Sequence, residues 1–133
     1  MGYNIYKSMK KETKQWLKIS SEDRDIAVEM WQTKRSVYSV MFWQQAVEKI
    51  LKAYIVEFID VLPKKTHDID TLLKQAKLDI KELPFSNVKE LSLAFTRTRY
   101  EDLSRQHYTK RNIVEPLVVM AEKLYIWIEN QLK

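Results

Sequence analysis

Residues that break helices are nearly absent from this sequence. Its single glycine is residue 2, and its three prolines are Pro63, Pro84 and Pro116. Since glycine and proline are the residues that most often interrupt a helix, the stretches between these positions favour long helices. At 133 residues, the chain has the size of one domain and can bury a core without disulfides or metals. We therefore expect a single all-α domain over residues 1–133.

The composition excludes several classes of protein and of site. Hydrophobic residues make up 45% and charged residues 31%, which is typical of a globular domain and not of a disordered chain. The absence of cysteine removes disulfides, thiolate nucleophiles and Cys-type zinc sites, and it favours a cytoplasmic protein. The longest uncharged stretch, residues 36–47, is too short to cross a membrane. With no Gly-rich phosphate loop and no paired-histidine motif, we expect neither a cofactor nor a metal.

The net charge of +5 is concentrated in two segments. Five lysines lie in residues 1–18, and five basic residues lie in residues 97–111: Lys7, Lys10, Lys11, Lys14 and Lys18, then Arg97, Arg99, Arg105, Lys110 and Arg111. Four of the first group, all except Lys10, have the spacing of one helix face. We interpret that face as solvated, with a stripe that contacts phosphates as the alternative.

Hydrophobic periodicity predicts two long helices in the first half of the chain, over residues 7–33 and 36–60. In the second helix, a polar strip lies opposite side chains that we expect in the core. The strip is Gln44, Gln45, Glu48, Lys49 and Lys52, and the core side is Ala46, Val47, Ile50, Tyr54 and Phe58. Near its start, apolar Val37, Tyr38 and Met41 continue the line of the strip. We expect these three residues to be buried, either within the monomer or against a partner, and they are our candidates for a dimer interface.

Capping signals place three further helices. Thr66 is the expected N-cap of a short third helix, and Ser86 or Asn87 that of a fourth helix ending near Arg99. The last helix begins at Thr109 or, through a capping box with Glu115, at Asn112. Short loops between such helices give an all-α, antiparallel up-and-down four-helix bundle with an additional short helix.

The segment between the last two helices carries the residues best suited to bind a nucleotide or RNA. Arginine forms bidentate contacts with phosphate, tyrosine stacks on bases, and histidine transfers protons near neutral pH. The candidate binding residues are Arg97, Arg99, Tyr100, Asp102, His107, Tyr108, Lys110 and Arg111. The alternative is a solvated loop with a local Arg99–Asp102 ion pair.

Several motifs resemble those of the HEPN family, the nucleotide-binding domain of higher eukaryotes and prokaryotes. FWQQAVEK at residues 42–49, followed by LKA at 51–53, looks like its signature helix; THDI at 66–69, with Leu72 and Leu73, is similar to its T-H-D-[LI] helix start. RYED at 99–102 resembles its R-Y-P-D element, and HYTK at 107–110 the opening of its last helix. Trp16, Leu17, Asp23 and Ala27 fit its first helix.

This resemblance implies a five-helix bundle, usually a homodimer, that is often the partner of a minimal nucleotidyltransferase in toxin–antitoxin-like pairs. Some relatives are metal-independent ribonucleases that use an Arg and a His four to six residues apart across the dimer cleft. Here seven residues separate Arg99 from His107, Tyr100 follows the Arg, and Glu101 replaces the family's proline. The leading hypothesis is therefore a binding module, with a ribonuclease using Arg99 and His107, or a pure protein-interaction bundle, as alternatives. Tyr100 and Tyr108 are candidates for modification by the partner.

Overall fold

The computed structural model describes residues 8–81, 88–100 and 103–133. Its elements are α1 (Lys11–Gln32), α2 (Ser36–Tyr54), the π-helical turn η2 (Ile55–Ile59), α3 (Ile69–Gln75), α4 (Val88–Arg97), α5 (Leu103–His107) and α6 (Arg111–Leu132). No strand occurs in these residues, so the expected all-α fold is confirmed. Within the same residues, no helix combines the length and apolar character needed to cross a membrane.

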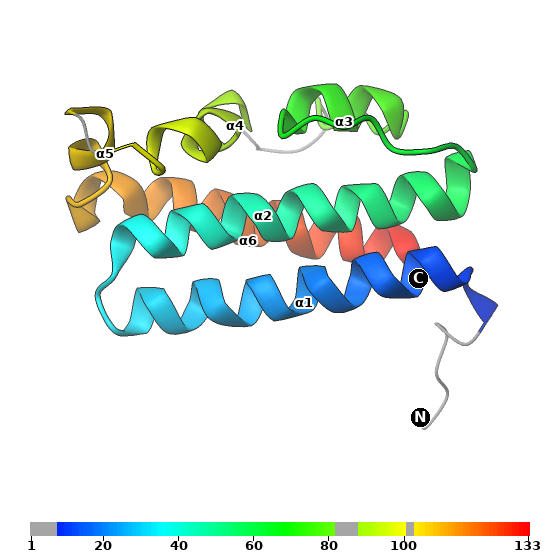
Figure 1. The fold of residues 1–133 in the computed structure, drawn as a ribbon, viewed down its shortest axis with the longest axis horizontal. Coiled ribbons are helices and arrows are strands. Elements are labelled where there is room, and N and C mark those ends of the chain that lie inside the picture. The colour runs from blue at the N-terminus through cyan, green and yellow to red at the C-terminus, as the bar shows by residue number, and fades with distance from the viewer. Residues whose placement is uncertain (1–7, 82–87, 101–102) are drawn as a thin grey trace.

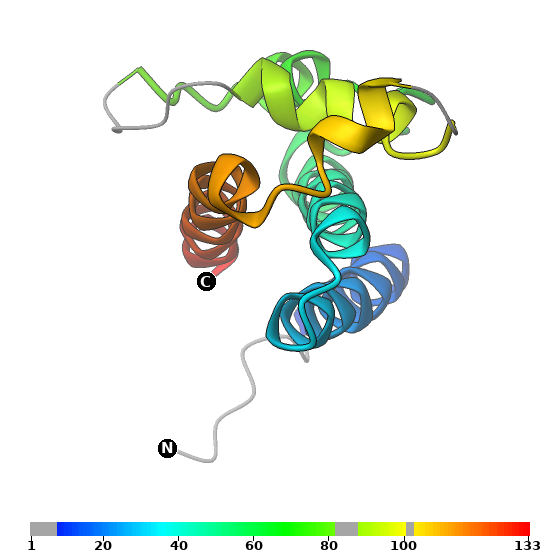
Figure 2. The same ribbon diagram turned by 90° about the vertical axis from the view of Figure 1, so that its left-hand side faces the viewer.

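The long helix α2 lies at the centre of the bundle. It packs against α1, α3, α4 and α6. Along the bundle α1 runs opposite to α2, α4 again opposite to α2, and α6 in the same direction as α2, which gives the expected up-and-down order (Figure 1). Viewed along the bundle, α3, α4 and α5 form a layer of short helices on the side of α2 away from α1 (Figure 2). Consequently α2 is covered on more than one face.

Apolar side chains of α2 and α6 form much of the core. Ala46, Val47 and Ile50 are buried, as the periodicity of α2 predicts. Trp43 is 2% exposed, and its ring meets the ring of Tyr125 from α6 edge to face, with 6.1 Å between the ring centroids. This arrangement suits the quadrupoles of two aromatic rings and fills the centre of the bundle.

The end of α2 departs from the predicted pattern. Phe58, which we expected in the core, is 51% exposed. It lies in η2, where the hydrogen bonds span five residues and each residue turns less about the helix axis than in an α-helix. A period of 3.6 residues per turn therefore predicts the wrong side of the helix for the Phe58 side chain. The turn ends at Asp60, whose left-handed φ of 61° stops the helix, and its amide donates to the Ile55 carbonyl at 2.9 Å.

Several predicted helix starts are corrected. Asp68, not Thr66, is the N-cap of α3, because its carboxylate accepts the amide of Thr71. The N-cap of α6 is Lys110, without a side-chain cap, so neither Thr109 nor the Asn112 capping box begins that helix. Pro116 lies inside α6. The predicted caps of α4 at 86 and 87 fall outside the described residues.

Candidate functional site

A buried carboxylate lies at the centre of the most developed polar cluster. The Glu48 side chain, on α2, is 4% exposed. Its Oε1 accepts from Gln44 Nε2 at 3.2 Å and lies 2.9 Å from His67 Nδ1, while its Oε2 accepts from Lys52 Nζ at 3.2 Å. Residues four apart share a helix face, so Gln44, Glu48 and Lys52 form one line. That line is buried, whereas a polar strip opposite the core of a helix is ordinarily solvated.

The same cluster attaches the segment before α3 to α2. Gln44 Nε2 also donates to the His67 carbonyl at 2.9 Å, so both the backbone and the ring of His67 bond to α2. The ring of His67 therefore lies on a carboxylate of α2. A carboxylate that binds one imidazole nitrogen fixes the ring and leaves the other nitrogen for chemistry.

An aromatic ring from α4 joins His67 to Arg99. The His67 ring stacks on Phe95 with 3.5 Å between centroids and 13° between planes. The Arg99 guanidinium carbon lies 3.6 Å from the centroid of the same ring. Two groups this close to one centroid cannot share a face, so His67 and Arg99 lie on opposite faces of Phe95. Arg99 Nη1 also donates to the Phe95 carbonyl, which fixes the guanidinium further.

Arg99 presents its positive charge at the surface of the domain. Partial burial lowers the pKa of the Arg99 guanidinium from its usual value, and the carboxylate of Glu48 opposes that shift. A guanidinium stays protonated at neutral pH even after such a shift. His67 is about half exposed, at 52% of its side chain. The site therefore offers a fixed positive charge and an oriented imidazole to solvent.

The start of α3 next to this site depends on Asp68. Its Oδ2 accepts from the Thr71 amide at 3.2 Å and the Thr71 hydroxyl at 2.5 Å, and the amide of Ile69 donates to Ser92 Oγ of α4 at 2.8 Å. The bond from the Thr71 hydroxyl is the main reason that the pKa of Asp68 is lowered.

We predict that Asp68→Asn makes stability less sensitive to acid. Because the pKa of Asp68 is lowered on folding, its stabilising effect is complete above the unfolded value of about 3.9 and is lost as pH falls through the lower folded value. Asparagine keeps the N-cap and does not titrate. Urea unfolding between pH 3 and pH 6 should show the stability advantage of wild type shrinking below about pH 4. A constant advantage across this range contradicts the assignment.

Two other predicted binding residues, Arg97 and Arg111, already contact groups within the protein. Arg97 pairs with Glu90 at 3.4 Å. Arg111 Nη1 donates to the Trp31 carbonyl at 2.7 Å, and its guanidinium carbon lies 3.7 Å from the Trp31 ring centroid. Both arginines therefore already contact the protein.

Tyr108 requires a correction. It is 1% exposed, so its ring cannot stack on a base and its hydroxyl cannot be reached for modification. Burial also raises the pKa of that hydroxyl. Asp102 lies outside the described residues. Tyr100, at 60% exposed, and the exposed His107 and Lys110 remain available.

The predicted catalytic pair is not brought together within the chain. The His107 ring meets the Tyr108 ring edge to face at 5.2 Å, and no hydrogen bond, ion pair or ring contact joins it to Arg99 in the described part of the chain. Arg99 instead shares its stack with His67. Sequence reasoning missed Glu48 and Phe95 as parts of the site. The one available signal was the Gln44–Glu48–Lys52 line beside a T-H-D motif.

The apolar start of α2 is buried in part within the monomer. Val37 is 8% exposed and belongs to the core of the monomer, so it is not available to a partner. Tyr38 is 44% exposed, with the Arg105 guanidinium carbon 5.4 Å from its ring centroid, and Met41 is partly buried. No group of three or more metal-ligating side chains occurs among the residues that the structure describes.

One comparison with known proteins identifies the family of this chain. The family model described as "HEPN domain" matches residues 13–131. Searches of curated proteins and of solved structures gave no match. The matched range includes α1 through almost all of α6 and contains both Glu48 and Arg99. The chain belongs to the HEPN family.

Proposed function

We propose that this protein is a dimeric HEPN module that binds the phosphate of a nucleotide or RNA at Arg99 and acts as the partner of a minimal nucleotidyltransferase. Family membership supports the general class, a nucleotide- or RNA-associated helical module. The observation that carries the binding proposal is the arginine held on Phe95 beside His67. The dimer and the nucleotidyltransferase partner are proposed from the resemblance of the motifs.

The position of Arg99 supports phosphate binding. A guanidinium fixed by a ring and a carbonyl loses little conformational entropy when a phosphate binds to it. The neighbouring Tyr100 is 60% exposed and offers a face for a base. Arg97 and Arg111 need not contribute, since each is already bound within the domain.

We expect Arg99→Gln to weaken binding of a fluorescent single-stranded RNA by about tenfold or more, because a charge-assisted phosphate contact is lost. Fluorescence anisotropy at several salt concentrations measures this effect. The slope of affinity against salt should also fall, since fewer counterions are released. Lys123→Ala, which removes an exposed lysine from α6, is the matched control. Equal affinities of Arg99→Gln and wild type would exclude the site.

The partner and dimer are tested separately. Tyr38→Glu places a charge on the proposed interface and should shift the protein to monomer in light scattering.

Co-expression with a neighbouring nucleotidyltransferase, followed by mass spectrometry, tests both complex formation and modification of Tyr100. A stable complex from a protein with no affinity for nucleotides or RNA would instead support the pure interaction bundle.

The Glu48–His67 pair favours a second candidate, metal-independent cleavage of RNA. A carboxylate on Nδ1 leaves Nε2 to accept the 2′-hydroxyl proton while the 2′-oxygen bonds to phosphorus. The bond from phosphorus to the 5′-oxygen then breaks, the imidazolium returns the proton to that oxygen, and Arg99 stabilises the charge that develops on the phosphorus centre. End-labelled RNA with EDTA provides the assay, with His67→Ala and His107→Ala compared. Cleavage lost only in His67→Ala supports this arrangement, whereas loss only in His107→Ala supports an Arg99–His107 site formed across two chains. If the wild-type protein does not cleave RNA, the binding module remains the proposed function.

A further inference from the structure

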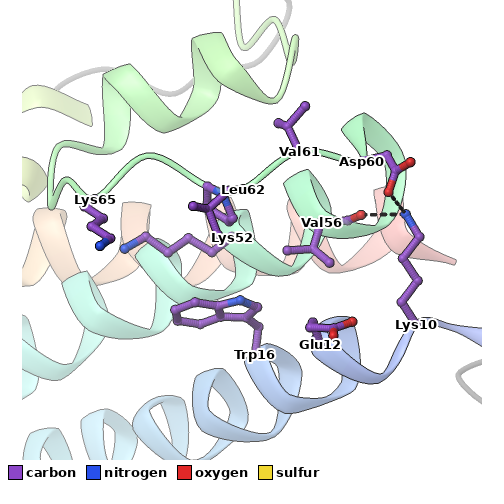
Figure 3. Close-up of a pocket in the computed structure, with 10 residues that line it drawn as sticks. Lys10, Glu12, Trp16, Lys52, Val56, Asp60, Val61, Leu62 and Lys65 are labelled. Atoms are coloured by element: carbon purple, nitrogen blue, oxygen red, sulfur yellow. Dashed lines mark hydrogen bonds and ion pairs between the residues drawn. The ribbon is translucent and has the colours of Figure 1, made fainter.

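A cavity lies between α1 and the end of α2, and no residue of the Arg99 stack lines it. It has a volume of about 450 Å³, within the range of small-molecule sites. Its lining comes from three parts of the chain: Lys10, Glu12 and Trp16; Lys52, Val56 and Asp60; and Val61, Leu62, Pro63 and Lys65. Figure 3 shows the Trp16 ring on one side of the cavity and the segment from Val61 to Lys65 on the other.

Two ammonium groups converge at one end of this cavity. Lys52 Nζ lies 5.5 Å from the centroid of the Trp16 ring, and Glu48 holds this ammonium from the buried side. The Lys65 side chain points toward that of Lys52 (Figure 3). Lys65 has no ion pair to any residue that the structure describes. Glu48 balances the charge of Lys52, so the unbalanced positive charge at this end of the cavity is that of Lys65.

The opposite end of the cavity is already neutralised. Lys10 Nζ bonds Asp60 Oδ1 at 2.6 Å and the Val56 carbonyl at 2.9 Å (Figure 3). Between the two ends the walls are mainly apolar, and Val61 and Leu62 are 47% and 80% exposed at the rim. The cavity therefore has one cationic end and an aromatic, apolar body.

We propose that this cavity binds a planar aromatic anion. The aromatic ring would stack on Trp16, and a phosphate or carboxylate group would lie between Lys52 and Lys65. The cavity shares no residue with the Arg99 stack, and Glu48, which contacts both Lys52 and His67, lies between the two sites. Adenosine monophosphate is a suitable probe because it combines both chemical features and can be separated into adenosine and inorganic phosphate.

The test is calorimetric titration of the whole protein with adenosine monophosphate, adenosine and inorganic phosphate. We expect the monophosphate to bind at least tenfold more tightly than either part, and Lys65→Ala and Trp16→Leu each to weaken it about tenfold. Lys64→Ala is the matched control, since Lys64 is an exposed neighbour that does not line the cavity. Lys65 is also exposed, so Lys65→Ala should fold normally, and circular dichroism verifies Trp16→Leu.

Arg99→Gln separates this proposal from the function proposed above. Binding of the monophosphate that persists in Arg99→Gln and falls in Lys65→Ala supports the cavity. Binding that falls in Arg99→Gln but not in Lys65→Ala or Trp16→Leu overturns the cavity and leaves the Arg99 site intact. Absence of any binding, or an affinity of Lys65→Ala for the monophosphate equal to that of wild type, also overturns it.

Discussion

Glu48→Ala is expected to lower the free energy of unfolding by about 3 kcal/mol, because it leaves a buried ammonium without its carboxylate. Glu48 and Lys52 are 4% and 10% exposed at their side chains, so water compensates little for the loss. Gln44 loses an acceptor as well, and the His67 ring loses the group that orients it. Urea unfolding at neutral pH measures the change. RNA binding at Arg99 should weaken in the same variant, since Phe95 loses an ordered neighbour.

A double variant distinguishes the unpaired charge from simple loss of packing. Glu48→Ala with Lys52→Met removes both charges and keeps an apolar chain near Trp16, so it should recover part of the lost stability. The carboxylate–ammonium pair is not the main contribution if the double variant is less stable than Glu48→Ala alone. A loss below about 0.5 kcal/mol in Glu48→Ala would contradict the burial of the cluster.

Trp43→Ala should cost about 4 kcal/mol, the largest effect that we expect from one substitution. The ring is 2% exposed and contacts the Tyr125 ring, so its removal leaves a cavity between α2 and α6 that the long helices cannot close. Thermal and urea unfolding both report this loss. Trp31→Ala removes a ring of the same kind from the partly buried end of α1, and it should cost clearly less. Equal costs would contradict the core position of Trp43.

The bundle could be predicted from the sequence because its determinants are local. The lack of glycine and proline within residues 11–32 favours one continuous α1, as observed, and the apolar period of α2 correctly places Ala46, Val47 and Ile50 in the core. Phe58 was misplaced because the change from α- to π-helix at Ile55 leaves no clear signal in side-chain pattern. Asp68 and Thr66 are both good caps by residue type, and only the backbone conformation separates them.

The site was predicted only in part because it depends on tertiary contacts. Amphipathicity assigns Glu48 to water, since the rule assumes that a helix is buried on one face. Here the layer of α3 and α4 covers a second face of α2, and this cover buries Glu48 beside His67 (Figure 2). Arg99 was named as a candidate from its residue type and motif. Its position on Phe95 follows from their spacing of four residues at the end of α4, whereas the stacking of His67 on Phe95 depends on how α3 lies beside α4.

The central position of α2 also determines which parts of the domain can open first. Since α1, α3, α4 and α6 all pack against it, α2 cannot open without disrupting most of the bundle. The layer of α3 and α4 can detach from α2 and α6 while α1, α2 and α6 remain associated, so its amides should exchange with solvent before those of α2. His67 is held by Glu48 and Gln44 of α2 only when that layer is docked. A ligand that binds only the docked arrangement of the site would therefore slow the exchange of α3 and α4, far beyond the atoms that it touches.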